Sequence, residues 1–193
     1  MNTLLPIYVK LDQINSLLIG GGSVGLEKLQ ALLSNSPNAK VKIVARDVIE
    51  EIVVLVNSNK SLSLEIRDFE EQDLEDIDLL IMATNNPDFN EEVKKLAKTR
   101  NLLINVADKP DLCDFYLGSV VQKGNLKIGI STNGKSPTIA KRLKEFLNDL
   151  LPEEIDETLN LMSSYRNSLK GDFQRKVTVL NAHTESLLKG AGS

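Results

Sequence analysis

The sequence predicts an α/β fold, in which a doubly wound parallel sheet is followed by a small α+β region and a helical C-terminal region. Over about the first 110 residues, short apolar runs alternate with segments whose apolar residues recur at helical spacing. A glycine-rich turn joins the first apolar run to the first helical segment. After Pro110 the alternation stops, and two short strand-like segments are followed only by helical patterns.

The first part of the chain contains apolar runs of strand length, bounded by polar or turn residues. They predict strands at residues 14–19, 41–45, 62–66, 77–83 and 102–106. Leucines from Leu26 to Leu33 and aliphatic residues from Ile49 to Val56 repeat at helical spacing, and a further helix is expected at about 87–98. Strands that alternate with helices in this way are typical of a parallel sheet with crossover connections.

The second part of the chain predicts a hairpin and three helices. Strand-like segments at 115–122 and 126–131 are separated by a compact turn, and a helix follows with an apolar face that runs from Ile139 to Leu150. Pro152 is expected to open the next helix, and a last polar helix is expected at about 173–188, with frayed residues after it. The predicted domains are residues 1–112, 113–150 and 151–193.

Composition narrows the class of protein. The chain of 193 residues is 41% apolar and 26% charged, with a net charge of −4, which suits a folded protein and argues against general nucleic-acid binding. The N-terminus lacks the pattern of a signal peptide, no apolar run reaches the length of a membrane helix, and the single cysteine, Cys113, suits a reducing compartment. We therefore expect a cytoplasmic protein. One histidine, His183, and one cysteine predict no metal site.

The segment GGGSVG satisfies the dinucleotide fingerprint G-x-G-x-x-G between a predicted strand and a predicted helix. Gly20 permits a tight turn, Gly22 lets the backbone approach a pyrophosphate, and Gly25 allows close packing of helix on strand. Free N–H groups at the start of the helix would bind the phosphates. The predicted cofactor-binding residues here are Gly20, Gly21, Gly22, Ser23, Val24 and Gly25.

Two further strand ends are candidates for cofactor binding. At the end of the second strand, Asp47 could hold the ribose hydroxyls of NAD, whereas Arg46 could accept the 2′-phosphate of NADP; the pattern favours NAD. Asp47 could also simply cap the next helix. After the fourth strand, Thr84 and Asn85 could bind ribose or nicotinamide groups, although both are common turn residues.

Asp108 is the leading candidate for the chemistry. It follows the buried run Leu102–Val106 and precedes the turn at Pro110. The carboxyl ends of the strands line the ligand crevice of an open α/β sheet. A carboxylate there can act as a base on a substrate that the bound cofactor oxidises.

The segment 121–144 carries six basic residues and no acidic ones, within a chain of net negative charge. It includes Lys123, Lys127 and Lys135, together with a turn that runs from Ser131 to the expected helix cap, Ser136. A basic hairpin beside a helix N-terminus is suited to a polyanionic small molecule, although some of these lysines are expected to be ordinary solvated residues.

Five segments together resemble the precorrin-2 dehydrogenase family, which includes the N-terminal module of siroheme synthase and bifunctional dehydrogenase/ferrochelatases. They are LPIYVKL, LLIGGGSVGLEK, MATNNPDFN, INVADKPDLCDFYLGSVV and ISTNGKSPTIAKRL, and they span residues 5 to about 143. Family members commonly carry proline at the position of Gly118 and glycine at that of Asn133. The resemblance implies a Rossmann-type NAD-binding domain, a central dimerisation region and a homodimer.

The resemblance also implies an activity, the NAD-dependent oxidation of precorrin-2 to sirohydrochlorin in siroheme or related tetrapyrrole biosynthesis. The family's catalytic aspartate falls on Asp108, which would be the general base. The substrate is then expected to contact Asn105, Lys123, Lys127, Ser131, Lys135 and Ser136. An alternative is a ferrochelatase activity that accompanies or replaces the oxidation. A less favoured alternative is an NAD-sensing regulatory domain, which needs only the fingerprint. No nucleic acid or membrane partner is expected.

Overall fold

The computed structural model describes residues 2–189, and of His183 and residues 185–189 it describes only the backbone. The chain divides into two compact units, residues 1–117 and 118–193, and each unit has its own sheet. Within residues 2–189, no helix has the length and apolar character needed to cross a membrane. The residues beyond 189, which were expected to fray, lie outside the described part of the chain.

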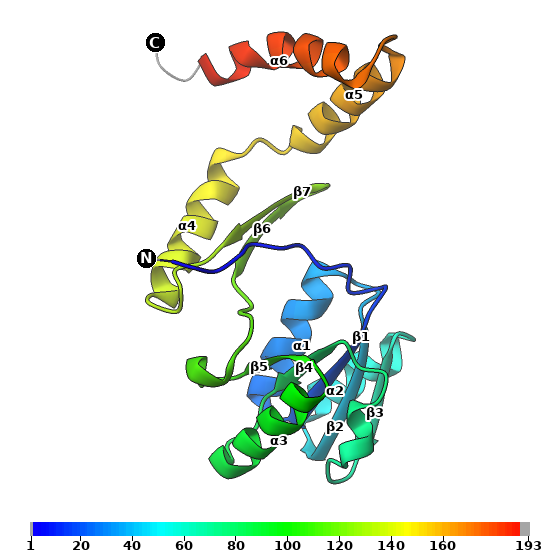
Figure 1. The fold of residues 1–193 in the computed structure, drawn as a ribbon, viewed down its shortest axis with the longest axis vertical. Coiled ribbons are helices and arrows are strands. Elements are labelled where there is room, and N and C mark those ends of the chain that lie inside the picture. The colour runs from blue at the N-terminus through cyan, green and yellow to red at the C-terminus, as the bar shows by residue number, and fades with distance from the viewer. Residues whose placement is uncertain (1, 190–193) are drawn as a thin grey trace. The chain divides into compact units, whose positions relative to one another are not determined.

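The first unit is built on a five-stranded sheet with the order β3-β2-β1-β4-β5, and every neighbouring pair is parallel (Figure 1). The strands are β1 (Asn15–Gly21), β2 (Lys40–Val48), β3 (Leu62–Ile66), β4 (Leu79–Met82) and β5 (Leu103–Val106). The strand order reverses direction between β1 and β4, which is the switch point where such sheets bind ligands. The predicted doubly wound parallel sheet is confirmed.

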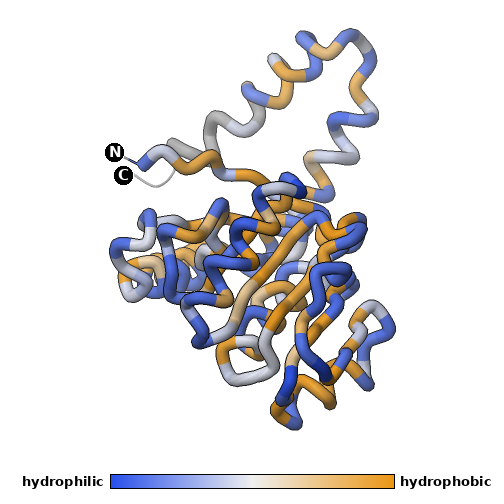
Figure 2. Tube along the Cα trace, turned by 60° about the horizontal axis from the view of Figure 1, so that its bottom comes forward, coloured by the Kyte–Doolittle hydropathy of each residue, from blue (hydrophilic) through white to orange (hydrophobic). Residues whose placement is uncertain are grey.

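The helices of this unit cover both faces of the sheet. They are α1 (Ser23–Asn35), α2 (Glu50–Ser58) and α3 (Pro87–Thr99). Alternate strand residues point to opposite faces, so Leu18 belongs to the core under α1 and α2, whereas Leu17 belongs to the core under α3. In Figure 2 the central strands are coloured as apolar, and polar residues recur along the helices around them.

Two short 3₁₀ helices were not expected from the sequence, η1 (Glu71–Leu74) and η2 (Pro110–Leu112). The expected strand at 115–122 begins only at Ser119, because the preceding residues are bound to β5 instead. The Asp114 amide donates to the Ile104 carbonyl at 2.8 Å, and the Asn105 side chain donates to the Phe115 carbonyl at 2.9 Å. Residues 114 and 115 therefore follow β5 rather than the hairpin.

The second unit contains a hairpin and three helices: β6 (Ser119–Lys123), β7 (Leu126–Ile130), α4 (Pro137–Leu150), α5 (Ile155–Ser168) and α6 (Phe173–Lys189). The two strands are antiparallel and are joined by Gly124 and Asn125. Ala140 of α4 and Val121 of β6 are buried in this unit. The helix expected to open at Pro152 begins at Ile155, because the Pro152 carbonyl accepts from the Ile155 amide in a turn that precedes α5.

Candidate functional site

A cavity of about 170 Å³ lies at the carboxyl edge of the parallel sheet, beside the switch point. The segments that follow β1, β4 and β5 all contribute to its wall, which is where an open α/β sheet binds its ligand. The lining residues are Val24, Ala83, Thr84, Asn85, Pro87, Asn90, Ala107, Asp108 and Lys109. Four of the predicted site residues, Val24, Thr84, Asn85 and Asp108, are therefore brought together on one cavity.

Three glycines of the GGGSVG turn, Gly20, Gly21 and Gly25, are required by the fold itself. Gly20 adopts a φ of 120°, and a Cβ atom on it would lie 2.3 Å from the Ala83 carbonyl oxygen. A Cβ atom on Gly25 would lie 2.2 Å from the Gly20 carbonyl oxygen, so α1 could not pack as closely on β1. These contacts explain Gly20 and Gly25 without any ligand.

Gly22 differs, because a Cβ atom on it would meet no atom within 4 Å. Its φ of −88° is also open to any residue, so neither packing nor backbone geometry requires glycine here. Gly22 is the N-cap of α1, no side chain caps this helix, and its first turn has no acidic residue. The N–H groups of the first turn, which Ser23 and Val24 begin, are left for a ligand, and an anion suits them best. The residues present therefore fit the pyrophosphate of a dinucleotide.

The segment after β4 is fixed by a buried amide. The Thr84 hydroxyl donates to Asn90 Oδ1 at 2.5 Å, and Asn90 Nδ2 returns a hydrogen bond to the Thr84 carbonyl at 3.3 Å. Asn86 caps α3 by accepting from the Phe89 amide. Asn85 is exposed on the cavity and keeps its amide available, whereas Thr84 already has a partner.

Asp108 lies on the first turn after β5, with a φ of 58°. The left-handed conformation is uncommon except for glycine, asparagine and aspartate, and here it turns the chain directly after the Ala107 amide donates to the Met82 carbonyl at 2.9 Å. The Asp108 side chain is exposed to the cavity, and among the described residues no hydrogen bond or ion pair occupies its carboxylate. Lys109 lies next to it on the cavity wall.

The end of β2 lies against the glycine turn. A Cβ atom on Gly21 would be 2.3 Å from the Asp47 carbonyl oxygen, and the Ile49 amide donates to the Gly21 carbonyl at 3.0 Å. Asp47 is exposed there, in the position expected for a ribose-binding acid. Arg46 is also exposed, and its guanidinium forms an ion pair with Asp68.

Asn105 does not line the cavity. It is buried on β5, and its amide donates to the Phe115 carbonyl and to Cys113 Sγ. Cys113 is half-buried and also receives a hydrogen bond from the Val106 amide; burial raises the pKa of its thiol. This arrangement gives Asn105 a role in holding the segment after η2, and its predicted contact with substrate stays a prediction.

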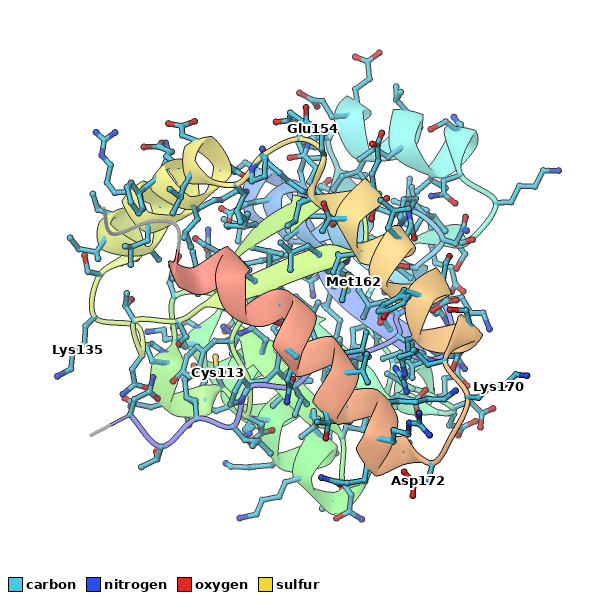
Figure 3. The ribbon with its side chains drawn as sticks, turned by 90° about the horizontal axis from the view of Figure 1, so that it is seen from above. Cys113, Lys135, Glu154, Met162, Lys170 and Asp172 are labelled. Atoms are coloured by element: carbon cyan, nitrogen blue, oxygen red, sulfur yellow. The ribbon has the colours of Figure 1, made fainter. Side chains whose placement is uncertain are left out.

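The other predicted substrate residues belong to the second unit, where they have different surroundings. The Lys123 ammonium donates to the Leu151 carbonyl and to Glu153, both at 2.6 Å, so its charge is largely used within the unit. Ser136 caps α4 by accepting from the Ile139 amide at 3.2 Å. Lys135 is exposed on the turn before α4 and extends outward (Figure 3).

Two further residues of the second unit complete this set. The hydroxyl of Ser131 accepts from the Asn133 amide at 3.2 Å, which fixes the start of the same turn. Lys127 lies on β7 opposite Gln122 and is half-buried. Of the predicted basic residues, Lys135 is thus the most accessible to an anionic ligand.

Five cavity residues were missed from the sequence, and two of them, Asn90 and Lys109, have polar side chains. Lys109 directly follows Asp108, so a search for charged neighbours of the candidate base would have found it. Asn90 lies inside the helical pattern of α3, where an amide is ordinary, and only the tertiary structure shows its bonds to Thr84. Within the described residues, no three His, Cys, Asp or Glu side chains are grouped so as to hold a metal ion.

Comparison with known proteins gives two family models. The family described as "Putative NAD(P)-binding" matches residues 7–119, and the family "Sirohaem biosynthesis protein central" matches residues 123–150. The chain is 34% identical over 171 residues to a siroheme synthase of Vesicomyosocius okutanii subsp. Calyptogena okutanii, and 35% identical over 170 residues to a siroheme synthase of Pseudoalteromonas translucida. These alignments cover 89% and 88% of the chain but only 36% and 35% of the relatives, so the chain spans about a third of their length.

A solved structure named "SirC, precorrin-2 dehydrogenase" matches with a TM-score of 0.71 and 24% sequence identity. The match covers 93% of this chain and 88% of that one. The likeness shows that the two chains share a fold, with a parallel sheet, a small antiparallel sheet and C-terminal helices.

Proposed function

The chain belongs to the NAD(P)-binding family whose model spans residues 7–119, and we propose from this that it is an NAD-dependent dehydrogenase that oxidises precorrin-2 to sirohydrochlorin. The names of the siroheme synthase relatives and of the matching structure support this substrate. One observation carries the proposal: an exposed carboxylate, Asp108, shares a cavity with Val24, which lies in the glycine turn at the start of α1. A base thus lies beside the place where a dinucleotide would bind.

Each part of the cavity has a task in this proposal. The free amides at the start of α1 hold the pyrophosphate, and Gly22 lets it approach the backbone. Asn85, which is exposed on the cavity, binds a ribose or carboxamide group. When bound, the nicotinamide supplies an acceptor for two electrons, transferred as hydride. Asp108 takes the proton that the substrate releases in the same oxidation, so the carboxylate must be ionised beforehand.

The proposed substrate is a polycarboxylate, which suits a basic surface in an acidic chain. In the second unit, Lys135 is exposed on the turn before α4, and Ser131, Ser136 and Lys127 lie on or next to that turn and its strand. We propose that these groups and Lys123 bind carboxylates of the tetrapyrrole, with Lys135 the strongest contributor because it is exposed, and Lys123 the weakest because its ammonium already donates to Leu151 and Glu153. A free thiol at Cys113 suits the reducing conditions of the cytoplasm, where we place the reaction.

NAD rather than NADP is the proposed cofactor. Asp47 is exposed at the end of β2, next to Gly21, where a carboxylate can accept hydrogen bonds from ribose hydroxyls. The nearby Arg46 guanidinium is engaged by Asp68. The carboxylates at this end of the site can therefore accept hydrogen bonds from the ribose hydroxyls of NAD, and they would repel the 2′-phosphate of NADP.

The same exposed carboxylate suits a second reaction, the insertion of Fe²⁺ into sirohydrochlorin. Metal insertion releases two pyrrole protons, and the exposed Asp108 carboxylate can accept them one after the other, passing the first to solvent before it takes the second. The nitrogens of the macrocycle would supply the ligands to the metal. This activity needs no dinucleotide, so an assay without NAD separates it from the oxidation.

We further propose that the protein acts as a homodimer through α4. The side chains of Ile139, Leu143, Phe146 and Leu150 are between 44% and 63% exposed and follow one another at intervals of four, three and four residues. This spacing is that of a seam between two helices. Large apolar side chains gathered on one exposed face mark an interaction surface, and a second copy presents the same seam.

The test is a spectral assay of sirohydrochlorin formation from precorrin-2 and NAD, with wild-type protein and the Asp108→Asn variant. Asparagine tolerates the left-handed backbone at this position, so the fold is kept while the base is lost. We expect the variant to turn over about 10² to 10⁴ times more slowly, with NAD binding retained by calorimetry. Asp111→Asn, an exposed aspartate outside the cavity, is the matched control and should keep wild-type turnover.

The outcomes separate the alternatives. Wild-type turnover in the Asp108→Asn protein would show that this carboxylate is not the base. NAD binding by the wild type without any sirohydrochlorin formation would favour the regulatory alternative. Incubation of sirohydrochlorin with Fe²⁺ in the absence of NAD tests chelation separately, and the same Asp108→Asn variant should lower its rate.

A further inference from the structure

The loop after β3 brings an acidic side chain to the ribose end of the cofactor site. Asp68 lies on this loop, and its carboxylate forms an ion pair with the Arg46 guanidinium at the end of β2. Arg46 is one residue before Asp47, whose carbonyl lies against Gly21. In a parallel sheet with this glycine turn, the end of β2 is where the adenosine ribose of a dinucleotide lies, and the group at its 2′ position distinguishes NAD from NADP.

The charges at this edge disfavour an additional phosphate. Arg46 contributes one positive charge, and Asp47 and Asp68 contribute two negative charges, so the edge is negative overall. The side chains of Arg46 and Asp68 are 79% and 66% exposed, and they would meet a ligand at the protein surface. A guanidinium binds phosphate most strongly while its donors are free, and here the Nε–H of Arg46 already donates to the Asp68 carboxylate.

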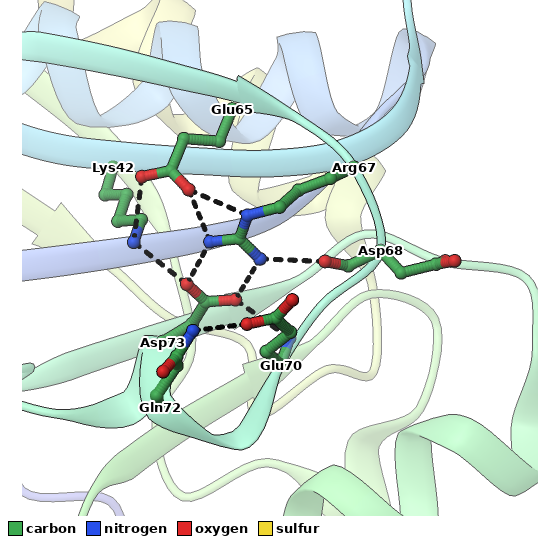
Figure 4. A network of polar contacts seen from close by, with 7 residues as sticks. All are labelled: Lys42, Glu65, Arg67, Asp68, Glu70, Gln72 and Asp73. Atoms are coloured by element: carbon green, nitrogen blue, oxygen red, sulfur yellow. Dashed lines mark hydrogen bonds and ion pairs between the residues drawn. The ribbon is translucent and has the colours of Figure 1, made fainter.

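The position of Asp68 is fixed by an ionic network within the first unit (Figure 4). The Arg67 guanidinium donates to the Asp68 main-chain carbonyl at 2.8 Å, and it is held by two hydrogen bonds to the buried Asp73 at 2.6 and 2.8 Å. Lys42 of β2 and Glu65 of β3 complete the network, with Lys42 Nζ 2.9 Å from Asp73 and 3.1 Å from Glu65.

This network determines which of two arginines, Arg46 at the end of β2 or Arg67 on the loop after β3, can be reached by a ligand. The donors of Arg67 are used by Asp73, Glu65 and the main chain, so only Arg46 is a candidate for the 2′-phosphate. In Figure 4 the Asp68 carboxylate points away from the network that holds its main chain. The loop thereby presents this carboxylate to Arg46 rather than to Arg67.

We propose that Asp68 is a specificity-determining residue, which makes the site select NAD by engaging Arg46 and repelling a 2′-phosphate. The inference rests on the proposed function, since it needs a dinucleotide bound at the glycine turn. Asp68 acts through Arg46 and touches no reacting atom, so it is a positioning residue. Asp68 is thus a second acidic residue at this edge, beside Asp47, and it comes from the loop after β3. The dinucleotide fingerprint does not predict it.

The experiment measures the dissociation constants of NAD⁺ and NADP⁺ for the full chain by titration calorimetry, without substrate. We expect Asp68→Asn to lower the dissociation constant for NADP⁺ about ten-fold relative to that for NAD⁺, because one negative charge is lost and Arg46 is released. Asp68→Glu, which keeps the charge, should restore the wild-type ratio. Asp12→Asn, an exposed aspartate elsewhere on the first unit, is the matched control and should leave the ratio unchanged.

A double-mutant cycle tests the mechanism through Arg46. Arg46→Gln should raise the dissociation constant for NADP⁺ by less than about three-fold in the wild type, where Asp68 engages the arginine. In the D68N protein it should raise this constant by about ten-fold. An unchanged NADP⁺/NAD⁺ ratio in D68N, or equal effects of Arg46→Gln in both backgrounds, would overturn the inference. If the wild type bound neither dinucleotide, the proposed function itself would fail, and the two failures are thus distinct.

Discussion

Gly22 is the residue at which the structure adds most to the fingerprint. The motif predicts three glycines with three tasks, but the packing accounts only for Gly20 and Gly25, whose Cβ atoms would lie 2.3 and 2.2 Å from main-chain oxygens. Gly22 faces open space and needs no unusual backbone conformation. Glycine there is explained by what approaches from outside the chain, which makes it the direct test of dinucleotide binding.

We expect Gly22→Ala to lower the free energy of unfolding by less than about 1 kcal/mol, because the added methyl group meets no atom of the protein and the remaining cost is that of alanine as a poorer N-cap. The same methyl group would obstruct a pyrophosphate, so NAD binding should weaken by more than about ten-fold. Gly25→Ala should do the reverse and destabilise the fold by about 1 to 3 kcal/mol through its clash with Gly20.

Urea titrations and calorimetry on the two variants provide the measurements. Equal NAD affinity in wild type and Gly22→Ala would contradict the placement of the pyrophosphate.

The roles of single residues were predictable from the sequence where the residue type reflects the backbone conformation, as with these glycines. Asn133 is similar: it stands where the resembling family commonly has glycine, and its φ of 55° is one that asparagine tolerates. Asp68 was not predictable, because its role depends on Arg46, 22 positions earlier in the chain.

At the scale of elements, the five strands of the first unit were predictable, because each is a short apolar run and the strand at 62–66 matches in both bounds. The 3₁₀ helix η1 was not. Its residues show no apolar period. It is held by the buried Asp73, which accepts hydrogen bonds from Lys42 of β2 and from Arg67, directly after β3. Ion pairs between distant segments leave no periodic signal in a sequence.

We expect Asp73→Asn to lower the free energy of unfolding by about 2 to 3 kcal/mol at pH 7, because it leaves two cations facing a neutral amide. Hydrogen bonds from Arg67 and then Lys42 hold the pKa of the Asp73 carboxyl below its ordinary range, against the opposing effect of burial. A folded-state pKa below the unfolded one favours folding above the unfolded pKa of about 3.9, and this contribution is lost as the pH falls further.

The measurement is urea unfolding of wild type and Asp73→Asn between pH 7 and pH 3. The wild type should lose more stability than the variant at the acid end of this range, so the difference between them should shrink. Asp12→Asn, on the surface, should follow the wild-type curve. A difference that stays constant down to pH 3 would show that the network does not contribute through the ionised Asp73.

At the scale of the whole molecule, the order of elements predicted the fold class. The alternation of strand and helix patterns predicted the parallel sheet, and the loss of this alternation after Pro110 predicted a second region. The structure divides the chain after residue 117, whereas a three-part division at 112 and 150 was predicted and stays a prediction. Periodicity also predicted an apolar face on α4, but it could not say which residues of that face are covered.

The structure resolves that face into two parts. Ala140 is buried and Leu147 is half-buried within the second unit, whereas Ile139, Leu143, Phe146 and Leu150 remain exposed. A helix that packs on its own hairpin with one side thus keeps a second apolar side for another partner. Burial of such a seam in a symmetric pair would also explain why large aliphatic and aromatic residues are retained at the surface.

We expect the wild type to be a dimer in sedimentation equilibrium, and Phe146→Gln to weaken its dimerisation by at least about 30-fold, because a buried aromatic residue in a helix seam typically contributes 2 kcal/mol or more. Lys141→Gln, an exposed residue of the same helix outside the seam, should keep the wild-type dissociation constant. Circular dichroism and thermal unfolding of the full chain check that both variants are folded. A monomeric wild type, or a Phe146→Gln protein that dimerises normally, would remove α4 as the interface.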